Sequence, residues 1–316
     1  MITEILQLML TKGIGNTKIS KILEYIQLNP NTSIEYVCSD YSTLSTVINC
    51  DENTFELMVK NKENAIEIES KLNEDQIVVI TKNDSNYPPQ LIDSLKNNAP
   101  AVLFAKGNID LLKEKAVGFC GSRNVSEKGF HITEECVKQL INHNISIVSG
   151  YANGTDIAAH NAAMTYGGNT VFVLAEGILT FNIKKTIKEH LTMNNHVFIS
   201  QFLPTSVWSP SKAMQRNSVI IGLSRAMILV ESRNTGGTYS AGIETLKRRL
   251  PLFVVDYQYP TVSSEANSFF IKRGGIPLRG KQGIPNIKNI LDAVDNPQSL
   301  VANSSNTEQL IFKGFV

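Results

Sequence analysis

Residues 145–160 read ISIVSGYANGTDIAAH, and this stretch decides the fold class. Its first four residues, 145–148, form a short apolar run that predicts a buried β-strand, and residues 156–166 have a composition typical of a helix. Ser149, Gly150 and Gly154 lie in the short loop between them. A strand that leads through a glycine-rich loop into a helix is half of a βαβ unit, so the stretch predicts a parallel sheet.

The same alternation continues on both sides of this unit. We expect further strands at 116–120, 170–175, 197–200, 226–231 and 252–256, and helices at 126–143, 182–192, 211–223, 237–249 and 263–273. Two β-rich runs, 77–80 and 101–105, precede them. Helices between successive strands cover both faces of a sheet. We therefore predict an α/β, Rossmann-like fold with a mostly parallel, doubly wound sheet in a domain that spans residues 76–290.

The first 72 residues have apolar positions at helical spacing instead. A break at 12–15 separates two helices, and others are expected near 33–38, 42–48 and 52–70. The helix–Gly-Ile-Gly–helix unit resembles a helix-hairpin-helix or SAM-like module, whose glycine N–H groups can contact DNA phosphate. A simple packing module with a glycine turn explains the same residues and is favoured, because the segment is acidic. We expect a small helical N-terminal domain at 1–72 and a C-terminal tail at 291–316.

The charges are distributed unevenly along the chain. Thirty Lys and Arg against 29 Asp and Glu leave a net charge of +1. Residues 1–75 contain twelve acidic residues and six lysines, which is a net charge of −6, so the remainder carries +7. The positive charge therefore accompanies the glycine-rich loops, where an anionic partner is expected.

The sequence also excludes several classes of protein. No apolar run approaches the roughly 18 residues of a membrane span, and no signal peptide is recognisable. The four cysteines, at positions 38, 50, 120 and 136, show no CxxC pairing. We therefore expect a cytoplasmic protein with neither membrane association nor a disulfide framework.

Ligands of open α/β sheets bind beyond the carboxyl ends of the strands, and three glycine-rich loops are expected there. We predict phosphate contacts from Gly121, Ser122, Arg123, Ser149, Gly150, Asn153, Gly154, Arg216, Asn217, Gly236, Gly237 and Thr238. Supporting roles are expected for Lys184, Lys185, Asp156, His160 and Glu231. Asp156 is equally compatible with a helix N-cap, and His160 with helix packing. A coenzyme would use one or two such loops, whereas a polyanion could use all three.

Catalytic machinery is not recognisable in this set. No second His or carboxylate stands at metal-ligand spacing from His160, and neither GxGxxG nor GxxxxGK[ST] occurs. No nucleophile is paired with a base. We therefore predict no metal, no cofactor and no catalytic residues.

Taken in order, these residues resemble the DprA/Smf family of DNA-processing proteins. The resemblance covers about residues 77–280 and is carried by Tyr87-Pro88-x-x-Leu91, Gly121-Ser122-Arg123, Ser149-Gly150-x-Ala152-x-Gly154-x-Asp156 and Arg216-Asn217-x-x-Ile220. It implies a non-enzymatic protein that binds single-stranded DNA, forms a homodimer and helps to load a RecA-type recombinase during natural transformation. It also implies that Arg216 and Asn217 lie in a basic loop.

The sequence departs from the family pattern at two places that bear on the site. The usual Arg-Asn-Arg is Arg216-Asn217-Ser218 here, and the usual Ser-Gly-Ser-Leu is Thr-Gly-Gly-Thr at 235–238, as in nucleotide-binding Rossmann relatives. These departures indicate a divergent member, for which a paralogous role such as anti-phage defence is open.

Two other interpretations stay open from the sequence. A nucleotide-binding or nucleotide-hydrolysing Rossmann protein would use the Thr-Gly-Gly-Thr loop with Glu231, Glu176 and His160. A purely interacting protein would use the acidic helices and the tail. Phe181, Phe202, Trp208 and Tyr239 are candidates for base stacking, although packing is favoured for each.

Overall fold

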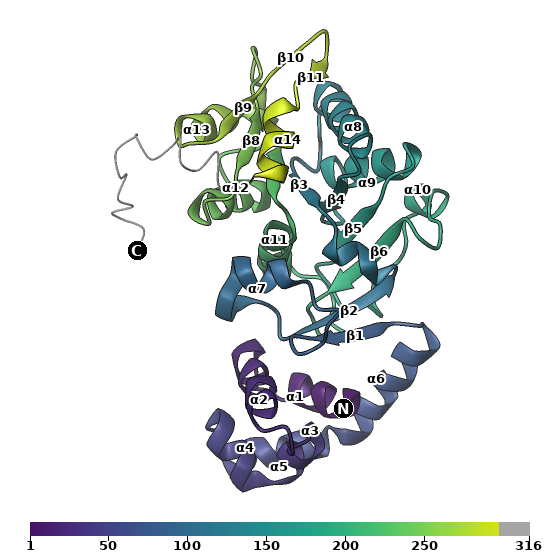
Figure 1. Ribbon diagram of the computed structural model, residues 1–316, viewed down its shortest axis with the longest axis vertical. Coiled ribbons are helices and arrows are strands. Elements are labelled where there is room, and N and C mark those ends of the chain that lie inside the picture. The colour runs from purple at the N-terminus through teal and green to yellow at the C-terminus, as the bar shows by residue number, and fades with distance from the viewer. Residues whose placement is uncertain (297–316) are drawn as a thin grey trace.

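The protein, described here from a computed structural model over residues 1–296, is organised around one nine-stranded sheet (Figure 1). The strand order is β1-β2-β6-β5-β4-β3-β7-β8-β9. The bounds are β1 (Val78–Thr81), β2 (Val102–Gly107), β3 (Ala116–Cys120), β4 (Ser146–Ser149), β5 (Thr170–Val173), β6 (His196–Ser200), β7 (Ala226–Leu229), β8 (Leu252–Val255) and β9 (Ile276–Leu278). Strands β3 to β9 pair in parallel, while β1 and β2 are antiparallel additions beside β6. The predicted mostly parallel sheet is confirmed.

The chain changes direction once within this sheet. From β3 it proceeds through β4, β5 and β6 towards one edge, then returns to β7 on the other side of β3 and continues to β8 and β9. The topological switch point therefore lies between β3 and β7, which pair from Val117 opposite Ala226 to Cys120 opposite Leu229. Ligands of doubly wound sheets bind at such a point, beyond the carboxyl ends of the strands.

Helices cover both faces of the sheet, as the alternating pattern predicts. One face packs against α8 (Glu127–Ile141), α9 (Thr155–Thr165) and α14 (Lys288–Asp295), with buried side chains such as Phe119, Val137 and Ile290 between them. The other face packs against α7 (Pro89–Leu95), α11 (Pro210–Leu223), α12 (Gly237–Lys247) and α13 (Asn267–Lys272). Central strands are apolar on both faces because both are buried.

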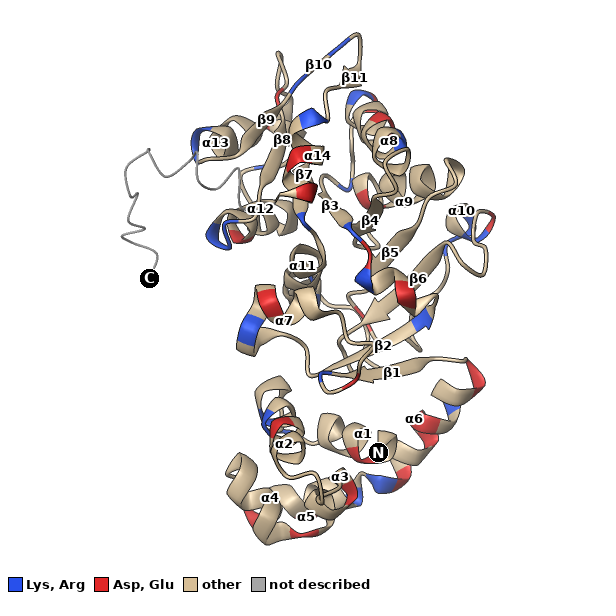
Figure 2. Cartoon of the chain, in the orientation of Figure 1, with Lys and Arg blue, Asp and Glu red and all other residues tan. Residues whose placement is uncertain are grey.

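The first part of the chain forms six helices, which lie below β1 and β2 in Figure 1. They are α1 (Ile2–Leu10), α2 (Asn16–Leu28), α3 (Ile34–Ser39), α4 (Tyr41–Ile48), α5 (Glu52–Lys60) and α6 (Lys62–Glu74). Asn16 links them to the sheet domain, because its side chain donates to the Ala99 carbonyl (3.0 Å) and accepts from the Ala101 N–H (2.6 Å). Figure 2 shows acidic residues repeated along α6. The domain boundary near residues 72–76 stays a prediction.

Several expected elements differ in extent. The helix expected at 182–192 is only α10 (Lys185–Lys188), in which Ile187 alone is buried, so a longer helix would gain little from packing. The helix expected at 263–273 is divided into η3 (Val262–Ser264) and α13. Helix α14 occupies the first residues of the segment expected as a tail, and residues 297–316 lie outside the described part.

The remaining short elements are η1 (Lys96–Asn98), η2 (Ile109–Lys113) and a hairpin of β10 (Gly280–Lys281) with β11 (Ile284–Pro285). Over residues 1–296, no helix combines the length and the apolar character that crossing a membrane requires.

Candidate anion-binding site

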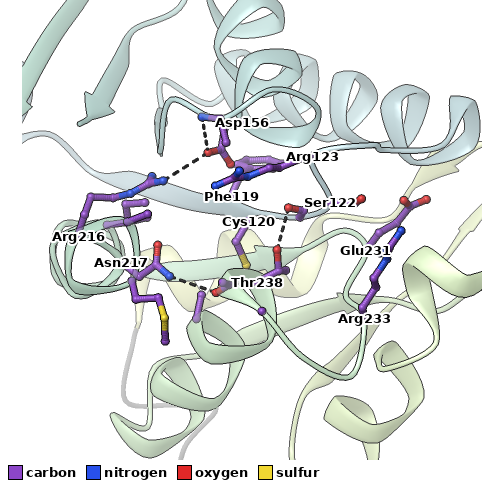
Figure 3. A pocket seen from close by; sticks show the side chains of 18 of the residues that line it. Phe119, Cys120, Ser122, Arg123, Asp156, Arg216, Asn217, Glu231, Arg233 and Thr238 are labelled. Carbon is purple, nitrogen blue, oxygen red and sulfur yellow. Dashed lines mark hydrogen bonds and ion pairs between the residues drawn. The ribbon is translucent and has the colours of Figure 1, made fainter. Parts of the chain in front are cut away.

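A pocket of about 510 Å³ lies at the topological switch point, beyond the carboxyl ends of β3 and β7 (Figure 3). We call it the switch-point pocket. Its polar lining comprises Gly121, Ser122, Arg123, Asn124, Asp156, Arg216, Asn217, Glu231, Arg233 and residues 235–238. Since β4, β3 and β7 are neighbours in the sheet, the loops that follow them meet at one place, as the sequence predicts.

The loops after β3 and β4 are in direct contact. The Thr155 N–H donates to the Ser122 carbonyl over 3.1 Å, which joins the start of α9 to the β3 loop. Gly154 has φ of +79°, and a Cβ at this position would lie 2.3 Å from the same carbonyl oxygen. Only glycine fits this conformation and this distance. Gly154 therefore brings the two loops together and does not itself line the pocket.

Arg216 and Asn217 lie in the middle of helix α11, and this corrects the expectation of a basic loop. Arg216 is only 7% exposed, and its Nη2 is 3.8 Å from Oδ2 of Asp156. Its Nε has no hydrogen-bond partner among the described residues. Burial lowers the pKa of Arg216, an effect that Asp156 opposes. The guanidinium is thus a buried cation at the pocket wall, and its Nε–H is free to donate a hydrogen bond to a ligand.

The loop after β7 places a helix N-terminus against the same pocket. Helix α12 begins at Gly237 after the N-cap Gly236, whose φ is +100°, and no side chain caps it. Thr238 Oγ1 donates to the Gly121 carbonyl over 2.8 Å, and Asn217 Nδ2 donates to the Gly237 carbonyl over 3.1 Å (Figure 3). These contacts hold the positive end of the helix dipole at the pocket, where it favours an anion.

Asp156 serves the architecture of the β4 loop. It is 8% exposed and accepts from Ser149 Oγ (3.0 Å) and from the Ala152 N–H (3.1 Å). Burial raises the pKa of Asp156, while the neighbouring Arg216 lowers it. The N-cap of α9 is Gly154, so Asp156 is not the N-cap that the sequence allowed. Ser149, expected to contact phosphate, is fully buried and holds Asp156 instead.

His160 is a packed structural residue, the second of the two roles that the sequence allowed. Its ring is fully buried and stacks on Phe172 with 3.8 Å between the centroids. Nε2 donates to the Gly150 carbonyl (2.7 Å), and Nδ1 lies 2.6 Å from Thr170 Oγ1. Burial lowers the pKa of His160 to about 3, and the side chain is neutral at physiological pH.

Glu231 lines the pocket, but its carboxylate is hydrogen-bonded to Ser126. The Ser126 hydroxyl and N–H both donate to it, the N–H over 3.2 Å, and Ser126 is in turn the N-cap of α8. Glu231 therefore connects the end of β7 to the start of α8. Asn267 completes this region, since its side chain accepts from the Ser232 N–H and donates to the carbonyls of Val230 and Val255.

A second, adjoining cavity of about 370 Å³ lies beyond the ends of β4 and β5, and we call it the aromatic cavity. It is lined by Arg123, Asn124, Tyr151, Ala152, Asn153, Ala175, Glu176, Lys184, Trp208 and Arg216. Lys184 Nζ donates to Asn153 Oδ1 (2.8 Å) and to the Tyr151 carbonyl (2.9 Å). Burial lowers the pKa of Lys184. Arg123 and Arg216 line both cavities, which therefore adjoin, and we call the two together the cleft.

The structure brings most of the predicted residues to this cleft. Gly121, Ser122, Arg123, Asn153, Asp156, Lys184, Arg216, Asn217, Glu231, Gly236, Gly237 and Thr238 line it, whereas Ser149, Gly150, Gly154, His160 and Lys185 do not. Sequence reasoning missed Asn124 and Met214. Asn124 directly follows the Gly-Ser-Arg motif, a signal that could have found it, while Met214 carries no such signal. Within the described residues, no cluster of three or more His, Cys, Asp or Glu could hold a metal.

A doubly wound sheet with arginines and an uncapped helix N-terminus at its switch point defines a Rossmann-like fold with a candidate anion-binding site. The model of the DNA recombination-mediator protein A family matches residues 78–287. The chain therefore belongs to this family, and the predicted resemblance to DprA/Smf proteins is confirmed.

Relatives support this assignment at the level of sequence. The DNA processing protein DprA of Streptococcus pneumoniae is 36% identical over 157 residues, which are 49% of this chain and 54% of the relative. The DprA of Bacillus subtilis is 30% identical over 159 residues, 49% of this chain and 53% of the relative. The matched region thus spans about half the length of each of these curated relatives.

Solved structures support it at the level of the fold. The X-ray structure of Streptococcus pneumoniae DprA matches with a TM-score of 0.73 and 26% identity, covering 90% of this chain and 96% of that one. A DprA structure from Helicobacter pylori, described for its single-stranded DNA binding mode, matches with a TM-score of 0.56 at 22% identity over 71% of this chain and 96% of that one, and shows the shared fold.

Proposed function

We propose that the protein binds single-stranded DNA through its sugar–phosphate backbone in the cleft formed by the switch-point pocket and the aromatic cavity. The observation that carries the proposal is the convergence of Arg123, Arg216 and the uncapped start of α12 on one pocket. Planar guanidinium groups and helix N–H groups are the donors that phosphate oxygens accept from. Family membership, and the DNA named for the Helicobacter pylori relative, agree with this ligand.

The same residues favour binding without catalysis. The carboxylates of Asp156 and Glu231 are engaged by Ser149 and Ser126, respectively, and His160 is enclosed and neutral. A general base must reach the proton that it abstracts. These three side chains hold loops in place, so we propose a binding protein and assign no catalytic residue.

Binding to oligonucleotides across a salt series tests this proposal. Each phosphate contact that is lost reduces the slope of log K against log salt by about one unit. We expect Arg123→Ala, an exposed residue at the cleft, to weaken binding and reduce the slope by this amount. Arg216→Ala should have the same effect where circular dichroism shows matched folding.

Lys247→Ala is the matched control. Lys247 is an exposed cation at the far end of α12 from the switch-point pocket, so its removal should leave the slope close to the wild-type value. Unchanged affinity and slope in both arginine variants, at matched folding, would exclude the cleft as the DNA site.

A free nucleotide is a second candidate ligand, favoured by one observation. The Thr-Gly-Gly-Thr loop leads into the uncapped α12 at a pocket of about 510 Å³, which lies within the range of about 300–1,000 Å³ for small-ligand sites. A thermal-shift screen separates the two proposals. Stabilisation by one mononucleotide or dinucleotide, with none by oligo-dT, would favour the free nucleotide.

The partners and the cellular role follow from the family as proposals. We propose a cytoplasmic homodimer that acts in DNA processing or recombination, with engagement of a RecA-type recombinase or a paralogous role such as anti-phage defence. Light scattering tests the dimer. A pull-down with a RecA-type recombinase, in the presence and absence of single-stranded DNA, tests the partner.

A further inference from the structure

The aromatic cavity differs in chemistry from the neighbouring switch-point pocket. The switch-point pocket gathers arginines and a helix N-terminus, and its two carboxylates, Asp156 and Glu231, accept hydrogen bonds from neighbouring loops. The aromatic cavity has two polar aromatic side chains, Trp208 and Tyr151, and the carboxylate of Glu176. A surface built only for phosphate needs neither exposed rings nor a carboxylate without hydrogen-bond donors. The two cavities share Arg123, so a ligand group in the aromatic cavity would be adjacent to a phosphate bound at that arginine.

Trp208 is an exposed ring at the wall of this cavity. It lies in the irregular segment between β6 and α11, and 45% of its surface is exposed. The Arg123 guanidinium stands 5.6 Å from its ring centroid, which keeps the cation beside the indole. Bases stack on exposed aromatic side chains in single-strand binding proteins, and loss of such a ring weakens binding roughly tenfold. Trp208 is therefore positioned to contact the base of a nucleotide whose phosphate meets Arg123.

Glu176 follows β5 and contributes a carboxylate to the same cavity. The described residues donate no hydrogen bond to this carboxylate, whereas those of Asp156 and Glu231 are fully engaged. Lys184 lines the same cavity and its charge attracts this carboxylate, but none of the described residues fills the hydrogen-bonding capacity of the Glu176 oxygens. An ionised carboxylate only accepts hydrogen bonds, and it pairs with the amino group of cytosine.

We propose that the aromatic cavity is a nucleobase subsite, in which Trp208 stacks on the base and Glu176 accepts a hydrogen bond from a base amino group. This inference rests on the proposed function, in which the adjoining pocket holds the DNA phosphate. It predicts a base preference. Cytosine presents an amino donor to Glu176, whereas thymine presents a carbonyl oxygen at the equivalent position, which the carboxylate repels.

Oligo-dC and oligo-dT of equal length test the preference, because both are pyrimidine strands that differ at this edge. We expect the wild-type protein to bind oligo-dC several-fold tighter. Glu176→Gln should bring the two affinities together, because an amide both donates and accepts. The role of Glu176 would be overturned if Glu176→Gln had the same ratio of oligo-dC to oligo-dT affinity as the wild type. It would also be overturned if the wild type bound both strands equally.

Trp208 provides its own signal, since it is the single tryptophan of the chain. Oligo-dC should change its fluorescence, and a strand with abasic sites should change it much less at equal occupancy. Trp208→Ala should weaken oligo-dC binding roughly tenfold, and Trp208→Phe should restore most of it. Val207→Ala, at the exposed neighbouring position, is the matched control and should bind as wild type. Equal effects of intact and abasic strands would overturn stacking.

The arginine variants separate the two proposals. If Arg123→Ala weakens binding while Trp208→Ala and Glu176→Gln do not, the phosphate site stands and the base subsite fails. If the wild-type protein binds no single-stranded DNA, both proposals fail.

Discussion

The guanidinium of Arg216 lies directly against the Cα of Gly150, so that a Cβ at residue 150 would stand 1.5 Å from Nη1 of Arg216. Helix α11 carries Arg216 and the β4 loop carries Gly150, and the two residues are 66 positions apart in the chain. Glycine at 150 leaves the space that the buried cation occupies. The position of the cation therefore depends on the absence of a side chain in a different loop.

Gly150→Ala should consequently displace Arg216 without altering its charge. We expect weaker binding of single-stranded DNA, with a salt slope reduced by about one unit, as for Arg216→Ala. The free energy of unfolding should fall by about 1–3 kcal/mol, because a methyl group is forced into filled space. Gly15→Ala, in the helical N-terminal region and outside the lining of both cavities, is the control, because its Cβ meets nothing within 4 Å and its φ is negative. Wild-type affinity and slope in Gly150→Ala would show that the location of the guanidinium does not matter.

Gly154 and Gly167 form a matched pair for testing how the β3 and β4 loops are joined. Both have positive φ, +79° and +75°, but only at Gly154 does a Cβ meet other atoms. Gly167→Ala should cost about 1–2 kcal/mol of stability from the left-handed backbone alone. Gly154→Ala should cost at least that amount, because its ψ of −127° also disfavours a side chain, and about 1–3 kcal/mol more from the clash with Ser122 and Arg123. Chemical denaturation measures both, and equal losses would contradict the tight junction between the loops.

The sheet and the place of the site could be predicted from the sequence because buried parallel strands are apolar on both faces. The run at 226–231 was readable as a strand that leads into a polar loop, and β7 with its loop is found there. Since loops at the carboxyl ends of adjacent strands converge, the three glycine-rich loops could be assigned to one site. The strand could be predicted from the local hydrophobic pattern, and the shared site could be predicted from the general topology of parallel sheets.

The roles of individual side chains within the loops could not be predicted in the same way. Glu231 is held by Ser126, 105 positions earlier in the chain, and nothing near Glu231 in the sequence indicates this partner. Arg216 occupies one position of an amphipathic helix, and only packing of α11 against the β4 loop determines that it turns inward. Trp208 lies in an irregular segment without periodicity. Each of these depends on which distant segments meet.

The buried pair of Asp156 and Arg216 predicts a link between stability and anion binding. Asp156→Asn removes the counter-charge of a buried guanidinium, so the free energy of unfolding should fall by about 3 kcal/mol. An oligonucleotide phosphate can take the place of the carboxylate, so added oligonucleotide should raise the melting temperature of this variant more than that of the wild type. Glu244→Gln, which removes a partly exposed pair with Arg248, should cost only about 0.5 kcal/mol. Equal protection of Asp156→Asn and wild type by oligonucleotide would contradict the prediction.

His160 predicts how stability changes with pH. Burial lowers its pKa from the ordinary value of 6.5 to about 3. Between these two pH values the unfolded chain therefore binds a proton at His160, whereas the folded protein does not. Its contribution to stability is therefore complete above pH 6.5 and is lost as the pH falls towards 3, by at most about 1.4 kcal/mol per pH unit. Between pH 7 and pH 5, urea denaturation should show the wild type losing about 2 kcal/mol more than His160→Gln. His190→Gln, at an exposed position, should follow the wild type. If His160→Gln loses as much stability as the wild type over this range, proton uptake by His160 is not coupled to unfolding.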